Sequence, residues 1–528
     1  MLEYRKPPTP RDQMTLWSER LDDAVPVDHP VRLMETVFWE AAFEDVFRGM
    51  EQAQRQKEGQ PGYSPRMLAK VVVYCHLEKI RSSRRMAAAC VNRVDVRWLS
   101  EGLMPDHTTF TRLFRRHRTR LQGLLRATVK TARKAGLLTL EHVAVDGTFI
   151  EANASRKSVL DRKQIEQEER RLDEVIKGML KEHEQNDRIE DALAKRGSLA
   201  LGDDTQSDEQ RKRAFEQKRD RLRKAAESIE RRQKEPRRKD LPSPNPIASV
   251  TDPDSRHMKD KEHRRKPNYN VQMAVDSKAG VVVATRVDDH PNDMGQAIAM
   301  VDQTKTQCGE LPVEMSFDAG YHTGRAVAQL QTRGTTAYVS DPEGKSYRSA
   351  AEARDILASG GKLSQEQIKS LPRDSQNRFT RCCFVYDEAT DTYRCPAGEV
   401  MRLERRRTRS DRHGKVDSWE YATGGCATCR WATECSTSKW GRRIMRTEFD
   451  AARMNMLRRT SGPKGKERSS LRSRTVEPRF GEMKSVFGLR KFLRRGREMV
   501  ATEVSLVATA MNLGRLIRNA QRNAMMAS

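Results

Sequence analysis

The stretch HVAVDGTFIEANASRK, residues 142–157, decides the fold because it carries a carboxylate inside an apolar, strand-like run. Apolar residues alternate with others along it, and a glycine directly follows Asp146. Alternation with a period of two predicts a β-strand with one buried face. A lone buried carboxylate is destabilising unless it is paired or coordinates a metal ion. We therefore expect the partners of Asp146 to arrive from elsewhere in the chain.

A second aspartate stands in a matching context downstream, where a short apolar run ends at Asp318 and a small residue and a glycine follow. Between the two aspartates, YNVQMAVD (269–276) and VVVATRVDD (281–289) flank the turn-like SKAG and predict a β-hairpin. Strand-like and helix-like stretches alternate along this part of the chain, which indicates a mixed α/β sheet. In such a sheet we expect Asp146 and Asp318 to be adjacent in space. A single aspartate at a strand end is usually a cap or turn residue, whereas two in matching contexts favour a metal site.

The region 156–265 is charged and poor in aromatic residues. Apolar residues recur in it every seven positions, on both sides of the turn-like segment GSLALGDDTQSDE. They are Ile165, Leu172 and Met179, then Phe215, Leu222 and Ile229. This period predicts two packed helices that form a structural arm inserted into the sheet.

The N-terminal region is predicted to be helical from residue 11 to 135. One of its helices follows the start signal Ser64–Pro65, and another follows Asp106 as N-cap. The second helix carries Phe110 and Phe114 one turn apart, and its other faces are basic through Arg112, Arg115, Arg116 and Arg118. Short helices that end in a basic amphipathic one are typical of a helix-turn-helix-like DNA reader. An ordinary helical bundle with a solvated basic surface is the alternative.

The balance of charge points to a polyanionic partner. Among 528 residues, 100 Lys and Arg against 74 Asp and Glu give a formal net charge of +26, and arginines cluster in RRRTRSDRH (405–413). Phosphate neutralisation supplies most of the non-specific affinity for nucleic acid, so nucleic acid is the expected partner and a solvated basic surface the alternative. We find neither a signal peptide nor an apolar run of the roughly 18 residues that a membrane helix needs, and expect an intracellular protein without a membrane partner.

Six of the nine cysteines fall between residues 382 and 435, which suggests a metal site rather than disulfides. The expected ligands of a structural Zn²⁺ are Cys395, Cys426, Cys429 and Cys435. Four thiolates match the ligand count of a closed zinc site, although only one close pair, C-x₂-C, is present. An incidental cluster is the alternative, and Cys382 and Cys383 are possible substitutes as ligands.

Motifs spread over the chain resemble those of the DDE transposases of bacterial insertion sequences. They are SPRMLAKVVVYCHLEKIRSSRRMAAAC and PDHTTFTRLFRR in the helical region, then VAVDGTFIEANASR, TDPDSRHMKDKE, YNVQMAVD, FDAGYHT and RTVEPRFGEMKSVFGLRKFLRRG with VATEVSLVATAMNLGRL. The resemblance runs from about residue 15 to 520, with the motifs in the same order. It implies an RNase H-like catalytic core, a helical N-terminal domain and a cysteine-rich insertion.

The resemblance also assigns the acids. The first family acid falls on Asp146 of VDGT, the second on Asp318 of DAGY, and the glutamate on Glu477 of RTVEPRFGEMK. Glu482 is the alternative for the third acid, and Glu498 also lies in this part of the chain.

Two basic residues accompany the expected glutamate in the family. The lysine that the family carries seven positions later falls on Lys484, which we expect to hold a phosphate, a plain surface lysine being the alternative. The basic residue before the glutamate falls on Arg474, where this chain lacks one residue of the usual spacing. Tyr321 and His322, close to Asp318, are expected in either a substrate-contacting or a structural role.

The implied activity is that of a DNA transposase. Two Mg²⁺ ions, with Mn²⁺ as a substitute, would lie between the three carboxylates. The enzyme would bind terminal inverted repeats, cut the element ends and join their 3′ hydroxyls to target DNA, as a homodimer on double-stranded DNA in the bacterial cytoplasm near the nucleoid. The alternatives are a metal-dependent nuclease and a catalytically inactive DNA-binding relic of the same fold.

We therefore expect six regions along the chain. They are a helical DNA-binding domain (1–135), the first catalytic strand (136–155), a charged helical insertion (156–265), the RNase H-like core (266–350), a cysteine-rich insertion (351–440), and a basic segment with the catalytic-glutamate helix (441–528).

Overall fold

A computed structural model describes residues 21–53, 62–194, 205–234, 246–259, 264–411 and 414–527 of the chain. The chain divides into two compact units. One comprises Met1–Ala135 together with Ser505–Ser528, and the other comprises Gly136–Val504. The last 24 residues thus group with the N-terminal helices and not with the segment 441–504 that precedes them.

The first unit is helical in its described residues. Its helices are α1 (Pro30–Phe38), α2 (Ala41–Gln52), α3 (Pro65–Leu77), α4 (Ser83–Asn92), α5 (Val94–Leu99), α6 (His107–Arg116), α7 (Arg118–Lys134) and the C-terminal part of α18 (Arg497–Ala527). The predicted helix starts are confirmed, because the Ser64 side chain accepts a hydrogen bond from Met67 N and that of Asp106 accepts one from Thr109 N. These caps satisfy backbone N–H groups that a helix start leaves without partners.

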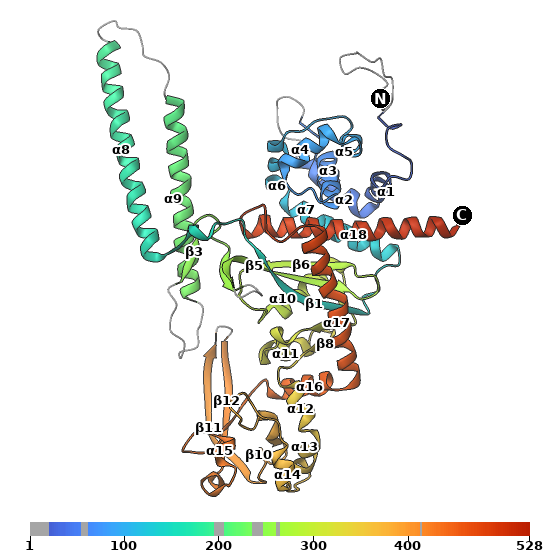
Figure 1. Cartoon of the computed structure of the whole chain (residues 1–528), viewed down its shortest axis with the longest axis vertical. Helices are drawn as coiled ribbons and strands as arrows, with labels where there is room; N and C mark the ends of the chain where they lie inside the picture. The colour runs from blue at the N-terminus through green and yellow to red at the C-terminus, as the bar shows by residue number, and fades with distance from the viewer. Residues whose placement is uncertain are drawn as a thin grey trace, which may run out of the picture. The chain divides into compact units, whose positions relative to one another are not determined.

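A mixed six-stranded sheet forms the centre of the second unit (Figure 1). Its strands are β1 (His142–Glu151), β4 (Arg256–Lys259), β5 (Arg265–Asp276), β6 (Val282–Asp288), β7 (Glu314–Phe317) and β8 (Thr336–Val339). Strand β1 pairs antiparallel with β5 and parallel with β7, and β5 and β6 form the predicted hairpin. Strand β4 pairs with β5, so the sheet already begins inside the region 156–265 that the sequence assigned to the insertion.

Helices cover this sheet. They are α10 (Gln296–Cys308), α11 (Gly324–Gln331), α16 (Asp450–Ser461) and α17 (Pro463–Gly481), with the short 3₁₀ turn η2 (Ala319–Tyr321) after β7. Helix α17 packs along β1 and also touches β5, β7 and β8. It contains Pro478 and continues into a π-helical turn, η5 (Glu482–Val486).

Two long helices, α8 (Arg162–Ala194) and α9 (Thr205–Gln233), lie side by side as the green pair of Figure 1. The predicted seven-residue repeat is confirmed as their contact at five of its six positions, since Ile165, Leu172, Leu222 and Ile229 are buried in one cluster and Phe215 packs against it. Met179, the sixth position, is half-buried. The short strands β2 (Val159–Asp161) and β3 (Ile247–Ser249) pair nearby, next to the 3₁₀ turn η1 (Arg156–Ser158). Most of the turn-like segment predicted between the two helices lies outside the described residues.

A second sheet, which the sequence did not predict, fills the cysteine-rich region. Its antiparallel strands are β9 (Val385–Asp387), β10 (Thr392–Arg394), β11 (Val400–Asp411), β12 (Gly414–Ala422) and β13 (Ile444–Thr447). Short helices accompany it: α12 (Gly344–Ser349), α13 (Ala351–Ala358), α14 (Gln365–Lys369), α15 (Ala432–Cys435), and the 3₁₀ turns η3 (Arg381–Cys383) and η4 (Gly424–Thr428). A separate core that includes Phe379, Tyr421 and Trp431 holds it together. Because β13 pairs with β12, this sheet extends past the expected boundary at residue 440.

One helix in the described part of the chain, Arg497–Met526, is long and apolar enough to cross a membrane. We expected from the sequence that the chain has no apolar run of this kind. By length and composition alone, that expectation is wrong. Its most apolar window is 89% buried inside the protein, which is the burial of a core helix.

Candidate active site

Asp146 lies in the middle of β1, where the strand faces α17. Its Oδ1 accepts a hydrogen bond from Gly147 N at 2.8 Å, and its Oδ2 pairs with Arg472 Nη1 at 2.8 Å. Burial raises the pKa of Asp146, the nearby carboxylate of Asp318 raises it further, and Arg472 acts in the opposite direction. The carboxylate is thus largely buried, with one cationic partner from a distant segment.

Asp318 directly follows β7, which is the parallel neighbour of β1. Its side chain caps η2 by accepting a hydrogen bond from Gly320 N at 2.5 Å. Strands β1 and β7 pair in parallel from His142 with Glu314 to Ala144 with Ser316, and the same offset of 172 residues relates Asp146 to Asp318. In agreement with this register, the Asp318 carboxylate adds to the raised pKa of Asp146. The structure therefore brings together the two aspartates that the sequence singled out.

Glu477 lies on α17 and is largely exposed, with 61% of its side chain accessible. Arg472, five residues earlier on the same helix, places Nη2 at 4.0 Å from Glu477 Oε1 while Nη1 contacts Asp146. One guanidinium thus connects the first and third expected acids. Glu482 instead pairs with Arg479 at 2.9 Å, and Glu498 lies in the first turn of α18.

Lys484 also reaches this region. It belongs to the π-helical turn η5, and its Nζ donates a hydrogen bond to Thr148 Oγ1 at 2.6 Å. The lysine ammonium is therefore held against β1, two residues beyond Asp146. Arg474 is exposed on α17, and it is Arg472, which the sequence did not single out, that contacts Asp146.

A buried polar network that the sequence analysis missed lies beside the two aspartates. Asp293, in the loop between β6 and α10, accepts hydrogen bonds at Oδ1 from Asn270 Nδ2 (2.9 Å) and Gln272 Nε2 (2.6 Å). The Tyr321 hydroxyl donates to Gln272 Oε1. Burial raises the pKa of Tyr321 well above its usual value, and Asp293, Asp146 and Asp318 all add to the shift.

Tyr321 is thus a buried group of the site, while His322 pairs with Asp341 at 3.1 Å. In the sequence, Asp293 is marked only by its place shortly before the stretch that forms α10. Nothing local in the sequence connects that place with Asp146.

The expected DNA-reading arginines belong to the helical unit. Arg112, Arg115 and Arg116 are exposed on α6, opposite the buried Phe110 and Phe114. The amphipathic helix predicted from the sequence is therefore present, with its basic face at the surface. It ends at Arg116, however, and Arg118, which the prediction placed on the same helix, begins α7.

The four expected zinc ligands line one cavity in the cysteine-rich region. Cys395, Cys426, Cys429 and Cys435 share it with aromatic and glycine residues, including Trp431 and Gly441. Burial raises the pKa of the Cys435 thiol to about 12, and the other three cysteines raise it further. Cys382 and Cys383, the possible substitutes, are instead buried near Thr380 and Pro372 and do not line this cavity.

The four sulfurs are not drawn into a tight cluster. Within the described residues, the group whose ligand atoms all lie within 4.8 Å of one another consists of Asp288, Asp289 and His290. The four cysteines therefore line one cavity, but their sulfur atoms are farther apart than the ligand atoms of the Asp288, Asp289 and His290 group.

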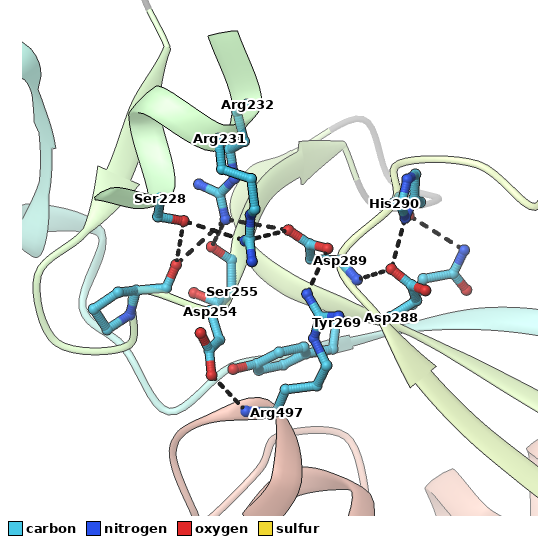
Figure 2. A network of polar contacts seen from close by, with 12 residues as sticks. Ser228, Arg231, Arg232, Asp254, Ser255, Tyr269, Asp288, Asp289, His290 and Arg497 are labelled. Atoms are coloured by element: carbon cyan, nitrogen blue, oxygen red, sulfur yellow. Dashed lines mark hydrogen bonds and ion pairs between the residues drawn. The ribbon is translucent and has the colours of Figure 1, made fainter. Parts of the chain in front are cut away.

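The Asp288–His290 group is part of a second polar network, between α9, β6 and the start of α18 (Figure 2). Three guanidinium groups approach the Asp289 carboxylate: Arg231 at 3.1 Å, Arg232 at 3.6 Å and Arg497 at 2.9 Å. Asp288 accepts from His290 Nδ1 at 2.6 Å and from Gln296 at 3.2 Å. Because both carboxylates are satisfied by protein donors, this group is a structural junction between three elements.

Comparisons with known proteins find two domain families in the chain. The family described as a transposase domain matches residues 19–116, and the family described as a transposase DDE domain matches residues 394–517. Neither curated proteins nor solved structures yield a match. The DDE match covers Glu477, Arg474, Lys484 and the four expected zinc ligands, whereas Asp146 and Asp318 lie outside the matched range.

Both matches make the chain transposase-like, with the match to a transposase DDE domain in its C-terminal part. More particularly, they confirm its likeness to the DDE transposases of insertion sequences. A DDE domain implies an RNase H-like fold, with which the mixed α/β sheet is consistent, and such domains generally use a divalent metal.

Proposed function

We propose that the protein is a transposase that binds the terminal inverted repeats of an insertion sequence, cuts the element ends and joins their 3′ hydroxyls to target DNA. The observation that carries this proposal is the closeness of two acids from distant segments, with the third acid connected to them through one arginine. Asp146 and Asp318 lie close together, and Arg472 links Asp146 to Glu477. Two or three carboxylates around one point suit metal-assisted phosphodiester displacement.

The donor set fits a hard divalent cation. All three side chains offer carboxylate oxygens, the ligands that Mg²⁺ prefers, and Mn²⁺ is expected to substitute for it. Two acids side by side, one of them largely buried, form a site that an added positive charge stabilises. Asp146, Asp318 and Glu477 would hold the cations, which when bound activate the attacking hydroxyl and stabilise the leaving oxygen.

Basic side chains around the acids would position the DNA. Arg472 neutralises Asp146 in the free protein and is placed to meet a phosphate when a cation takes over that task. Lys484 holds its ammonium beside Thr148, so it would contact the backbone of the strand being cut. Arg474 and the α6 residues Arg112, Arg115 and Arg116 would add contacts to phosphates or bases outside the reacting position, since phosphate contacts fix the register of a protein on DNA.

We propose in addition that Cys395, Cys426, Cys429 and Cys435 hold a structural Zn²⁺. Four thiols around one cavity match the ligand count of a closed tetrahedral site, and their sulfurs would draw together when the ion binds. The backbone N–H groups of Ala397 and Glu399 lower the pKa of Cys395 against the opposite effect of its burial, so they face its sulfur and would support a thiolate. Because burial raises the thiol pKa, zinc binding must release protons, and its affinity falls as the pH decreases.

Metal analysis of the purified chain tests the zinc site. We expect zinc in the wild type and its loss in Cys429→Ser. The control Cys308→Ser should retain zinc, because Cys308 lies outside the cysteine-rich region and is not one of the four expected ligands. Removal of the metal by a chelator should lower the melting temperature. A wild type that purifies without zinc and takes none up would refute the site.

The decisive test of the catalytic proposal is cleavage and joining of labelled DNA that carries the element's own ends, with Mg²⁺ or Mn²⁺. We expect both steps in the wild type and their loss in Asp146→Ala, Asp318→Ala and Glu477→Ala, with DNA binding retained. Glu482→Ala, next to the end of the same helix, is the matched control and should remain active. Loss of cutting in Glu482→Ala but not in Glu477→Ala would show that the third acid is misassigned.

The same experiment separates the alternatives. Cutting without strand-transfer products identifies a metal-dependent nuclease, and DNA binding without cutting identifies an inactive relic of the fold. A transposase must cut and join two element ends together, so we expect two copies of the chain on paired DNA ends. Its place of action would be the cytoplasm, where the bacterial DNA lies.

A further inference from the structure

Asp293 is held rigidly next to the proposed catalytic acids. Its Oδ1 accepts hydrogen bonds from the side-chain amides of Asn270 and Gln272, at 2.9 and 2.6 Å. Both amide residues belong to β5, the strand paired with β1, and both are buried. Gln272 lies directly opposite Gly147, the residue after Asp146. The carboxylate of Asp293 is therefore fixed in orientation from the strand that neighbours Asp146.

Asp293 comes close to Gly147 and Gly320, the two glycines beside Asp146 and Asp318. A Cβ atom added to Gly147 would stand 2.5 Å from Asp293 Oδ1. A Cβ atom added to Gly320 would stand 2.9 Å from Asp318 Oδ1 and 3.3 Å from Asp293 Oδ2. One point in space thus lies within 3.3 Å of carboxylate oxygens from both Asp318 and Asp293. Glycine at both positions leaves this space open.

The two oxygens of Asp293 differ in their surroundings. Oδ1 is satisfied by two neutral amides, whereas Oδ2 faces the Asp318 side of the site. Within the described residues, no lysine or arginine pairs with Asp293, in contrast to the Arg472 contact of Asp146. The three carboxylates in this small region are accompanied by two cationic groups, the Arg472 guanidinium and the Lys484 ammonium at Thr148. An excess of negative charge of this kind favours a bound cation with oxygen ligands.

We propose that Asp293 is a further carboxylate of the catalytic site, with Oδ2 directed at the divalent cation between Asp146 and Asp318. This inference rests on the proposed function, which supplies the cation. Asn270 and Gln272 keep the carboxylate in place by holding its other oxygen. Asp293 joins the set through the loop after β6, so the site draws its acids from four separate segments of the chain.

Mn²⁺ binding to the full-length protein without DNA tests the inference independently of activity. Asp293→Asn keeps an oxygen for the two amides and removes only the charge, so its fold should be retained and its melting temperature in the absence of metal should be close to that of the wild type. We expect its Mn²⁺ affinity, measured by electron paramagnetic resonance titration, to fall at least about tenfold, the scale on which ligand-shell substitutions act. Asp302→Asn, which removes an exposed acid on α10 that pairs with Arg333, is the matched control and should bind Mn²⁺ like the wild type.

Asp146→Asn in the same titration distinguishes the possible failures. If Asp146→Asn loses Mn²⁺ while Asp293→Asn binds it as tightly as the wild type, the inference is wrong and the proposed function stands. If the wild type neither binds Mn²⁺ nor cuts DNA, the proposed function fails and the inference falls with it. Reduced binding in both variants, with the Asp302→Asn control unchanged, supports the inference.

Discussion

Gly147 follows Asp146 in β1 and lies against two side chains from neighbouring segments. A Cβ atom there would stand 2.4 Å from Gln272 Nε2 and 2.5 Å from Asp293 Oδ1, closer than real Cβ contacts allow. We expect Gly147→Ala to destabilise the protein by about 1–3 kcal/mol, as overpacking of a buried position does. Denaturant unfolding measures this change in the free energy of unfolding.

Gly178, on the exposed surface of α8, is the matched control because no atom lies within 4 Å of its added Cβ. Gly178→Ala should stabilise the helix by about 0.5–1 kcal/mol, since alanine has the higher helix propensity. Equal stabilities of Gly147→Ala and the wild type would mean that the contacts between Gly147, Gln272 and Asp293 are looser than the structure has them.

Asp252 is fully buried, and its raised pKa predicts how the stability of the protein changes with pH. Its Oδ1 accepts hydrogen bonds from the Tyr269 hydroxyl (2.8 Å) and from Gly496 N (3.0 Å), and burial raises its pKa to about 6. The folded-state pKa lies above that of the unfolded chain, so the group's stabilising effect is complete below about pH 4 and is lost as the pH rises through about 6. Between about pH 4 and pH 7, the wild type should lose about 2–3 kcal/mol relative to Asp252→Asn.

Unfolding of both proteins by denaturant across this pH range provides the measurement. The comparison with Asp252→Asn removes the contribution of all other titrating groups, which the two proteins share. Parallel stability curves would contradict the assignment of a raised pKa to this carboxyl.

Single residues also show what the sequence could and could not predict about the site. Asp146 and Asp318 stood out because each interrupts or ends an apolar run and a glycine follows closely. Arg472 did not, because the choice between it and Arg474 depends on the rotation of α17 relative to β1, which no local pattern encodes. Asp293 was missed for a similar reason: its closeness to Gly147 arises only when the β5–β6 hairpin carries the following loop back to the sheet.

Among the elements, the helical pair α8–α9 is held by a small core of its own. Leu172 and Leu222 are buried where the two helices meet, whereas Val175, on α8, is 40% exposed. We expect Leu172→Ala or Leu222→Ala to destabilise the pair by about 2–4 kcal/mol through loss of burial and the cavity left behind. Val175→Ala, the control, should change stability by less than about 0.5 kcal/mol.

Hydrogen exchange of the backbone amides in α8 and α9 measures this effect locally. Protection in these helices should fall in both leucine variants while that of β1 and β5 stays unchanged, because the cluster is made only by the pair and the adjoining short strands. A loss of protection throughout the central sheet would show instead that the pair and the sheet unfold as one unit.

The elements that the sequence predicted are those with a long local pattern. The heptad period of α8 and α9 and the alternation in β5 and β6 extend over enough residues to be recognised. The five-stranded sheet of the cysteine-rich region was not predicted, because β9, β10 and β13 have only three or four residues and arginines fill much of β11. Its strands are stabilised by pairing with segments up to 29 residues away in sequence, such as Ser418 with Thr447, and not by local propensity.

At the scale of the whole molecule, the net charge of +26 should make DNA binding strongly dependent on salt. Exposed arginines of β11, in the long β11–β12 hairpin of Figure 1, concentrate part of this charge on one element. If this hairpin contacts the DNA backbone, neutralising Arg405, Arg406 and Arg409 to Gln should make the plot of log affinity against log salt less steep. Each lost phosphate contact contributes about 0.9 to the slope on double-stranded DNA.

A variant with the same change in net charge isolates the effect of position. Replacing the exposed α8 residues Arg170, Arg171 and Lys177 with Gln also removes three positive charges, so its long-range electrostatic effect matches that of the β11 variant. Fluorescence anisotropy with a labelled duplex over a range of salt concentrations gives both slopes. We expect the β11 variant to reduce the slope by up to about 3 and the α8 variant to leave it nearly unchanged, because only direct phosphate contacts release counterions. Equal slopes in the two variants would show that the charge acts through the whole molecule and that the β11–β12 hairpin does not touch the DNA.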